Sequence, residues 1–530
     1  MNQTARSYRG MVTAPHRLAA QAGLRVLEEG GNAIEAMVAA AGTIAVAYPH
    51  MNGLGGDNFW LIHEPGGAVI GIDACGAAAA HTDIAFYRSR GMTSIPPRGP
   101  LAALTVAGAV SGWQEALRIS TENWGGVLPL ARLLEDATFY AGDGIAVTKT
   151  LAENLLAKLP ELAATPGFGM TFLAQGKAPP EGARFRQPRL AATLKHLAED
   201  GLDGFYRGGL ARTIAADLAR AGSPLNLADL ERHKALRVDP LALEVAGHLV
   251  YNMPPPTQGL ASLILLGVFA RLDVSEAEGF AYVHALIEAT KAAFRVRDRH
   301  VTDPVYMTVD PTSFLTADVL DGMAAGIDRH RAAPWPEAQP GGDTVWLGAV
   351  DSKGLAVSFI QSLYWEFGSG TVLEETGLTW QNRGIGFSLD QAHRNSLRPQ
   401  RRPFHTIQPA LARRSDGRVM PYGTMGGEGQ PQTQAMIFTR HVLFGQDLQQ
   451  AVAAPRWLLG RTWGAETANL RIENRLRLDV VESLRGAGHD IEVVGPYEEV
   501  MGHAGALVHH PDGLIEGAAD PRSDGAAVGF

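Results

Sequence analysis

A Pro- and Gly-rich stretch meets an apolar, strand-like run at a threonine, and this junction constrains the fold more than any other part of the chain. Residues 332–342 include three prolines and show neither helical nor strand periodicity, which is typical of an exposed connection. Residues 345–350 are apolar with a β-branched valine at each end, 351–354 supply turn chemistry, and 355–360 form a returning strand. The pattern predicts a hairpin, with Thr344 at the first position of its first strand.

On this stretch alone, Thr344 has two interpretations. A β-branched residue is common at the start of a strand, so a purely structural role is the simpler one. The alternative is self-cleavage, in which the Thr344 hydroxyl attacks the carbonyl of Asp343 and hydrolysis of the ester leaves Thr344 as a new N-terminus. The freed α-amine ordinarily has a pKa of about 7.7 to 8.0, so near neutrality it can act as the base for its own hydroxyl.

The composition excludes several kinds of partner. Among 530 residues, 46 basic and 55 acidic side chains give a net charge of −9, which offers no electrostatic footprint for nucleic acid or an anionic membrane. Cys75 is the only cysteine, so neither a disulfide framework within the chain nor a cysteine-ligated zinc site is possible. The N-terminus lacks the apolar core of a secretory signal, and no run reaches about 18 apolar residues. We therefore expect a soluble, cytoplasmic protein.

Periodicity elsewhere predicts helices mixed with antiparallel strands. Residues 18–29 have helical spacing, and residues 34–47 are so uniformly apolar that their helix should be buried on all sides. Hairpins are predicted over 58–73 and 506–517. The region from about 110 to 330 is expected to be mainly helical. Further helices are predicted at 130–141, 190–198, 210–221, 281–296 and 478–485.

Several other motifs have both a functional and a plain structural interpretation. Adjacent Gly426 and Gly427, in a glycine-rich run without the ending of a phosphate loop, could aim two N–H groups at one oxyanion, although a tight turn is the simpler interpretation. Residues 54–57 are interpreted as a close-packing turn. Cys75, among small apolar residues, is expected to be buried and inert. The histidines show no metal-ligand spacing, so no metal site is predicted.

A series of motifs runs through nearly the whole chain in a fixed order. They are Gly10-Met11-Val12, Leu18-Ala19-Ala20-Gln21-Ala22-Gly23, Gly30-Gly31-Asn32-Ala33, Pro49-His50, Gly53-Leu54-Gly55-Gly56, Pro254-Pro255-Pro256, Gly342-Asp343-Thr344, Arg402-Pro403, Gly426-Gly427 and residues 518–527. With these motifs in this order, the chain resembles the gamma-glutamyltranspeptidase family of N-terminal nucleophile hydrolases. Chance agreement over so many motifs is implausible, and the resemblance favours self-cleavage at Thr344.

The resemblance implies an α+β fold, the αββα sandwich of two antiparallel sheets between helical layers. It implies a precursor cut between Asp343 and Thr344 into a large chain, 1–343, and a small chain, 344–530, that together form one αββα unit. Thr344 would be the nucleophile, Gly426 and Gly427 the oxyanion pair, and Ser362 a hydroxyl that supports the threonine. No cofactor is implied. The expected partners are a small-molecule substrate and the other chain of the same precursor, and a homodimer of processed heterodimers is compatible with the resemblance.

The sequence departs from the family where its transpeptidases hold the headgroup of an amino-acid substrate. Residues 78–83 lack the arginine that binds the substrate α-carboxylate in those enzymes. Tyr364 replaces an asparagine, the acidic partner of the α-amine falls at residues 385–386, and the paired serines fall at His405 and Thr406. The clamp for an α-amino acid is therefore missing at both ends.

Arg383 is a new cation at the place where the amine partner is expected. We expect it to bind a substrate carboxylate in a pocket shared with Tyr364, His405 and Thr406, because guanidinium and carboxylate form a planar, bidentate pair. The alternative is a structural ion pair of Arg383 with a nearby acidic residue. The candidates for that pairing are Glu366 and Asp390.

These departures predict a self-processing amidohydrolase that cleaves a small carboxylate-bearing amide, with oxamate, giving oxalate and ammonia, as a candidate. Two branches of the superfamily fit, the oxamate amidohydrolases of purine breakdown and the glutaryl-cephalosporin acylases. Bulky Tyr364, Trp365 and His405 would shrink the cavity and favour the former. A gamma-glutamyltranspeptidase or glutathione hydrolase is the alternative activity. A binding protein that never cleaves is the third possibility.

Overall fold

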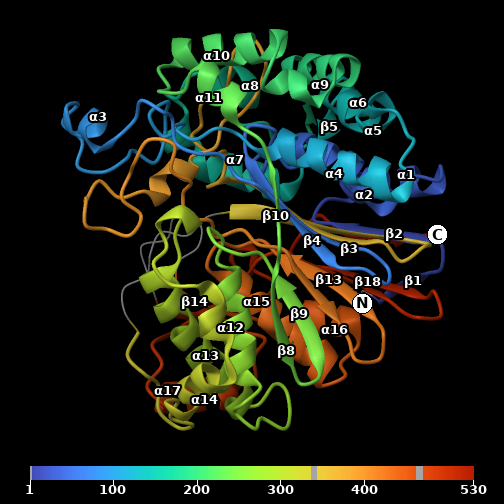
Figure 1. Cartoon of the computed structure of the whole chain (residues 1–530), viewed down its shortest axis with the longest axis vertical. Coiled ribbons are helices and arrows are strands. Elements are labelled where there is room, and N and C mark those ends of the chain that lie inside the picture. Colours follow the sequence, from blue (N-terminus) through green and yellow to red (C-terminus); the bar gives the residue numbers. More distant parts are fainter. Residues whose placement is uncertain (1–2, 336–342, 461–468) are drawn as a thin grey trace.

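The structure is a computed structural model that describes residues 3–335, 343–460 and 469–530, with only the backbone of Asp343 described. Two antiparallel sheets lie face to face between two layers of helices (Figure 1). The predicted αββα sandwich is therefore confirmed.

One sheet carries the predicted junction at its centre. Its strands, in spatial order, are β19 (Ala526–Gly529), β2 (Gly10–Ala14), β10 (Asp343–Asp351), β11 (Ala356–Tyr364), β3 (Asp57–His63), β4 (Val69–Ala74) and β7 (Leu236–Val238). The second sheet runs β1 (Ala5–Ser7), β18 (Ile515–Ala519), β17 (Ala504–His509), β13 (Val419–Thr424), β12 (Ala410–Arg413), β9 (His248–Asn252) and β8 (Leu241–Val245). Smaller sheets join β14 (Trp457–Leu459), β15 (Leu470–Glu473) and β16 (Ile491–Val494), and β5 (Ile145–Ala146) with β6 (Arg184–Phe185).

Helices form a layer on the outer side of each sheet, and further helices pack on those layers or at the edge of the molecule (Figure 1). They are α1 (Arg17–Glu28), α2 (Ala33–Ala47), α3 (Ile84–Arg88), α4 (Ala109–Trp124), α5 (Leu130–Leu133), α6 (Glu135–Asp143), α7 (Lys149–Leu162), α8 (Phe168–Phe172), α9 (Pro188–Asp200), α10 (Gly209–Ala221), α11 (Leu227–Arg232), α12 (Gly259–Phe269), α13 (Phe280–His300), α14 (Ala317–Ala325), α15 (Gly429–Phe438), α16 (Leu448–Ala453) and α17 (Leu478–Gly486). Short 3₁₀ or π turns are η1 (Leu202–Phe205), η2 (Pro304–Tyr306), η3 (Pro311–Leu315), η4 (Arg383–Gly386), η5 (Thr439–Leu443) and η6 (Glu499–Met501).

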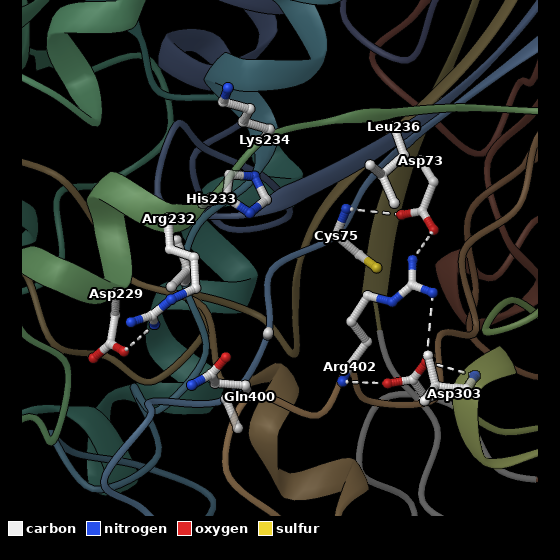
Figure 2. Close-up of a pocket in the computed structure, with 14 residues that line it drawn as sticks. Asp73, Cys75, Asp229, Arg232, His233, Lys234, Leu236, Asp303, Gln400 and Arg402 are labelled. Atoms are coloured by element: carbon white, nitrogen blue, oxygen red, sulfur yellow. Dashed lines mark hydrogen bonds and ion pairs between the residues drawn. The ribbon is translucent and has the colours of Figure 1, made fainter.

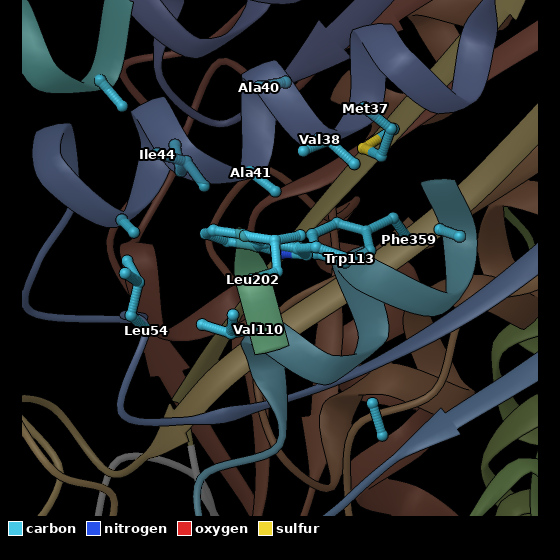
Figure 3. Packing of buried hydrophobic residues seen from close by; sticks show 14 of the residues in the cluster. Met37, Val38, Ala40, Ala41, Ile44, Leu54, Val110, Trp113, Leu202 and Phe359 are labelled. Carbon is cyan, nitrogen blue, oxygen red and sulfur yellow. The ribbon is translucent and has the colours of Figure 1, made fainter. Parts of the chain in front are cut away.

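Helix α2 forms the centre of one outer layer, and every one of its residues is buried. Its side chains pack against α1, α4, α6 and the first sheet, and Trp113 and Phe359 lie beneath the helix (Figure 3). The helix begins at Asn32, whose side chain accepts from the N–H of Glu35 while the Glu35 carboxylate accepts from the N–H of Asn32. This reciprocal cap satisfies donors that burial would otherwise leave unpaired.

Strand β11 has apolar side chains on both of its faces. Val357 and Phe359 face the helical layer of α2, whereas Ala356 and Ile360 belong to the cluster between the two sheets. Successive side chains of a strand point to opposite faces, so a strand in the middle of a four-layer sandwich must be hydrophobic on both. The same rule explains the apolar run predicted for residues 345–350.

Most predicted elements are confirmed, with three corrections. Thr344 is the second residue of β10 rather than the first. The helix predicted over 130–141 is divided at Leu134 into α5 and α6. Residues 236–252, placed in the mainly helical region, form β7, β8 and β9, and the tight turn between β8 and β9 has positive φ at Ala246 and Gly247. An alanine in that conformation is uncommon, so the turn carries no standard sequence signal.

Strands from both sides of the 343/344 junction pair with one another in the first sheet. Strand β10 pairs with β2, and β11 pairs with β3, so segments before and after the junction are joined by backbone hydrogen bonds. A break at this peptide would therefore leave the two segments held together. No helix within the described ranges combines the length and apolarity that a membrane span requires.

Candidate active site

Thr344 is completely buried near the start of α15. The Nε2 amide of Gln430 donates to the Thr344 hydroxyl oxygen at 3.4 Å, and Gln430 Oε1 accepts from the backbone N–H of Gln408 at 3.2 Å. The second bond fixes which end of the amide faces Thr344. Sequence reasoning missed Gln430, although its position directly after the glycine-rich run was an available signal.

Gly426 and Gly427 form the turn that leads into α15. Their φ values are +115° and +50°, in the region that favours glycine, so the turn interpretation is correct. Among the described residues, however, neither backbone N–H donates to an acceptor. Buried N–H groups without partners are rare. The turn therefore also presents two unengaged donors, and the two interpretations are compatible.

Arg383 is completely buried, and within the described part of the chain its hydrogen-bond acceptors are hydroxyl groups. Its Nη1 donates to Thr406 Oγ1 at 3.3 Å, its Nη2 donates to Ser362 Oγ at 3.4 Å, and the guanidinium carbon lies 3.9 Å from the centre of the Tyr364 ring. Its Nε has no partner among the described residues. Arg383 is thus in contact with three other predicted site residues.

No described carboxylate lies within ion-pair distance of Arg383, so the proposed structural pairing is wrong. Glu366 instead pairs with Lys158 at 3.4 Å and lies 3.9 Å from Arg98. Asp390 accepts from a neighbouring backbone N–H. Burial without a carboxylate partner lowers the pKa of the Arg383 guanidinium to about 10.

Tyr364 ends strand β11 opposite Asp343 and has a φ of +84°. A bulky residue with positive φ is a real outlier. Its backbone N–H donates to Ser362 Oγ at 2.8 Å, so one hydroxyl contacts both Tyr364 and Arg383. Strain of this kind clusters at ligand sites, because the surrounding structure must hold the residue in place.

His405 contacts protein groups through both ring nitrogens. Its Nε2 lies 3.0 Å from Asp57 Oδ2, and its Nδ1 lies 2.8 Å from the carbonyl oxygen of Pro403. Asp57 Oδ1 accepts from the N–H groups of Gly76 and Gly108. Burial and the nearby Arg383 charge lower the pKa of His405. Its predicted role as a substrate ligand remains a prediction, and Asp57 is a partner that sequence reasoning missed.

A pocket of about 350 Å³ opens beside this cluster. The pocket is lined by residues that include Tyr364, Phe404, Glu428 and 385–386. Tyr364 therefore lines this pocket and also contacts the buried guanidinium of Arg383, which is not itself among the lining residues. The residues at 385–386, where the family places its acidic partner, carry no charge.

Cys75 lies in a different pocket, between the first sheet and the loop at Arg402 (Figure 2). Arg402 binds Asp73 at 2.7 Å and Asp303 at 3.4 Å. Cys75 is buried, as predicted, and this burial raises the pKa of its thiol well above the usual range, which disfavours the reactive thiolate. The Arg402-Pro403 motif therefore connects the chain segment leading to His405 with β4 and η2.

Three potential metal ligands meet elsewhere in the described part of the chain, namely His284, Glu288 and His489. His284 Nδ1 lies 2.9 Å from His489 Nε2, and Glu288 binds the ammonium of Lys291 at 2.7 Å. An adjacent ammonium disfavours a cation, and the hydrogen bonds already satisfy these groups. The cluster ties α13 to the residues before 336, since Lys291 also donates to the carbonyl oxygen of Ala333.

Comparison with known proteins identifies the family. The model of the family described as gamma-glutamyltranspeptidase matches residues 19–530. The chain is 55% identical to the oxamate amidohydrolase proenzyme of Klebsiella pneumoniae subsp. pneumoniae, over 99% of each chain, and 41% identical to the glutathione hydrolase-like YwrD proenzyme of Bacillus subtilis, over 100% of each.

Among solved structures, the cephalosporin acylase from Bacillus halodurans superposes with a TM-score of 0.92 at 33% identity, covering 100% of this chain and 97% of that chain. The family model and this structural match each extend over nearly the whole chain. The chain therefore belongs to the gamma-glutamyltranspeptidase family of N-terminal nucleophile hydrolases.

Proposed function

We propose that the chain is the precursor of an amidohydrolase that uses Thr344, freed by cleavage after Asp343, to cleave a small amide bearing a carboxylate. Oxamate is the proposed substrate. The observation that carries this proposal is the buried Arg383, a cation with hydroxyl partners and no described carboxylate partner. An unpaired buried charge is strongly unfavourable, and a substrate carboxylate would compensate for it.

The proposed reaction has two halves. The Thr344 α-amine takes the hydroxyl proton as Thr344 Oγ1 attacks the amide carbon, and the N–H groups of Gly426 and Gly427 stabilise the oxyanion. The C–N bond then breaks, and the leaving nitrogen takes the proton and departs as ammonia. Water then attacks the ester carbon and gives a proton to the α-amine. The bond between that carbon and Thr344 Oγ1 breaks, the acid is released, and the amine returns the proton to Oγ1. From oxamate the products are oxalate and ammonia.

Supporting residues have distinct parts in this proposal. The Gln430 side chain donates to the proposed nucleophilic oxygen of Thr344. This bond engages one lone pair of that oxygen and leaves the other for attack on the substrate. Ser362, on the strand beside Thr344, accepts from Arg383 and so places a hydroxyl between the nucleophile's strand and the anion-binding cation. The two proposed chains, 1–343 and 344–530, would remain joined through the pairing of β10 with β2 and of β11 with β3.

The relatives support this choice and also define the alternative. The 55% identical relative is named an oxamate amidohydrolase proenzyme, which favours oxamate. The 41% identical relative carries a glutathione hydrolase-like name, and the superposed structure is a cephalosporin acylase. A glutathione hydrolase or a glutaryl-type acylase is therefore the second candidate, and it requires a site that accepts a longer acyl group.

A substrate panel tests the proposal. Cleaved enzyme is offered oxamate, a glutaryl amide and γ-glutamyl-p-nitroanilide, and the release of ammonia or amine is measured at equal concentrations. We expect oxamate to have the highest kcat/KM. If the γ-glutamyl compound is the best substrate, the proposed pocket chemistry is wrong and the glutathione hydrolase takes its place.

A further inference from the structure

Gln258 lies where three segments of the site meet, and the proposed reaction does not use it. It directly precedes α12 and is completely buried. Its Nε2 donates to the carbonyl oxygen of Thr406 at 2.6 Å and to that of Gly427 at 2.8 Å, while its Oε1 accepts from Arg297 Nη1 at 3.0 Å. Each polar atom of this amide therefore has a partner within the protein.

The orientation of the Gln258 amide is unambiguous. Arg297 can only donate hydrogen bonds, and the two carbonyl oxygens can only accept them, so the amide oxygen must face Arg297 and the NH2 group must face the carbonyls. Arg297 is itself fixed, because its Nη2 donates to Glu428 Oε1 at 2.7 Å and its guanidinium lies 3.8 Å from the centre of the Phe294 ring. The amide cannot rotate without breaking several buried hydrogen bonds.

The backbone beside Gln258 reinforces the same connection. The Gln258 N–H donates to the carbonyl oxygen of His405, and the His405 N–H donates to the carbonyl oxygen of Pro256, both at 2.9 Å. The turn before α12 is therefore hydrogen bonded to the segment that carries His405 and Thr406. Because α12 is buried along its whole length, this turn is supported by a rigid element.

The two carbonyls that Gln258 joins belong to the two ends of the proposed site. Thr406 supplies the hydroxyl that accepts from Arg383, at the carboxylate end. Gly427 belongs to the turn with unengaged N–H groups, at the end where the amide carbonyl reacts. One nitrogen bonded to both carbonyls holds these two segments at a fixed separation.

We propose that Gln258 is a positioning residue that sets the distance between the anion-binding end and the oxyanion-binding end, and so selects short acyl chains. The inference rests on the proposed function. Oxamate, with adjacent carbonyl carbons, needs these ends close together, whereas succinamate, whose carboxylate lies two methylene groups further away, needs them apart. Loss of the Gln258 hydrogen bonds should therefore lower the turnover of oxamate more than that of succinamate.

The test compares Gln258→Glu and Gln258→Met with Gln449→Glu as a matched control. Gln449 is also buried and also bridges backbone groups, through Ala519, but it contacts none of the site residues. Glutamate keeps the oxygen that faces Arg297 and loses the two donors, and methionine loses both functions. Rates are measured per mole of cleaved chain, so slow self-cleavage does not distort them.

For both Gln258 variants we expect kcat for oxamate to fall about 10²-fold, the effect of a displacement near 1 Å. The preference for oxamate over succinamate, as a ratio of kcat/KM values, should fall by about tenfold or more, while inhibition by oxalate changes little because Arg383 is intact. Gln449→Glu should keep the wild-type ratio.

Three outcomes would overturn the inference. They are an unchanged kcat, equal losses for both substrates with an unchanged ratio, and folded Gln258 variants that never self-cleave while the control does. The last would assign Gln258 to processing rather than to selection of chain length. A wild-type enzyme inert towards oxamate would instead refute the proposed function itself.

Discussion

The Arg383 guanidinium lies over the ring of Tyr364, 3.9 Å from its centre, at the point where β11 ends. The aromatic face partly offsets the cost of burying the cation, but it cannot supply the bidentate acceptor that a carboxylate offers. Tyr364 holds a strained backbone conformation in this position. The arrangement thus maintains a charged guanidinium with no described carboxylate in ion-pair contact, although the nearby charge of Asp57 raises its pKa against the effect of burial.

Arg383→Ala should raise KM for oxamate by about 10²-fold or more, because the substrate carboxylate would be desolvated without a partner. Arg383→Lys should recover only part of the loss, since an ammonium cannot form the planar pair. Steady-state kinetics on the cleaved enzyme measure both. Arg394→Ala is the control, because Arg394 lines the nearby pocket without contacting Ser362 or Thr406. Equal KM values for Arg383→Ala and wild type would refute carboxylate binding by Arg383.

Purified wild-type protein should contain a chain that begins at Thr344, and Thr344→Ala should remain one chain, because only a hydroxyl or thiol at this position can attack the Asp343 carbonyl. Thr344→Ser keeps the hydroxyl and should still be cleaved. Denaturing gels and N-terminal sequencing provide the measurements. The hypothesis fails if active wild-type protein yields only the original N-terminus.

Gly426→Ala should lower kcat by about 10² to 10³-fold, the loss typical of a missing oxyanion donor. At a φ of +115° an added Cβ is strained, so the peptide should rotate and move its N–H. The expected effect comes from this backbone strain and not from a steric clash, since the nearest atom to the new Cβ would be 3.5 Å away. Gly445→Ala, also at positive φ but in open surroundings, is the control and should retain activity. Comparable kcat values for both variants would argue against the oxyanion role.

The folded protein should lose stability between about pH 6.5 and pH 4. Burial lowers the pKa of His233 and His503 from 6.5 to about 4. Below pH 6.5 the unfolded chain binds these protons and the folded chain does not, so the free energy of unfolding falls as the pH drops towards 4. Each group contributes on the order of 3 kcal/mol over that range.

Urea midpoints at several pH values test this expectation. His503→Asn should flatten the decline between pH 6.5 and pH 4, whatever its effect on stability at neutral pH. His196→Asn, at a partly exposed position on α9, should leave the slope unchanged. A midpoint that is the same at pH 7 and pH 4.5 would contradict the assignment.

Local chemistry was sufficient to predict the elements that carry the proposed site. The Pro/Gly stretch, the threonine and the apolar run after it predict a hairpin because turn residues and strand period are local properties. The uniformly apolar sequence of α2 predicts burial on all sides for the same reason. The family motifs extended these local signals to the whole sandwich and to candidate site residues.

Only the tertiary structure decided how those residues meet. Asp57 reaches His405, Gln258 joins Thr406 to Gly427, and neither connection has a sequence spacing that could reveal it. Each depends on which strands pair across a sheet and how a turn packs against its end. The same is true of Arg383, whose residue type was visible in the sequence but whose lack of a carboxylate partner was not. Hydrophobic period and turn chemistry determine elements locally, whereas long-range packing determines which polar groups are buried together and which charge is left for a ligand.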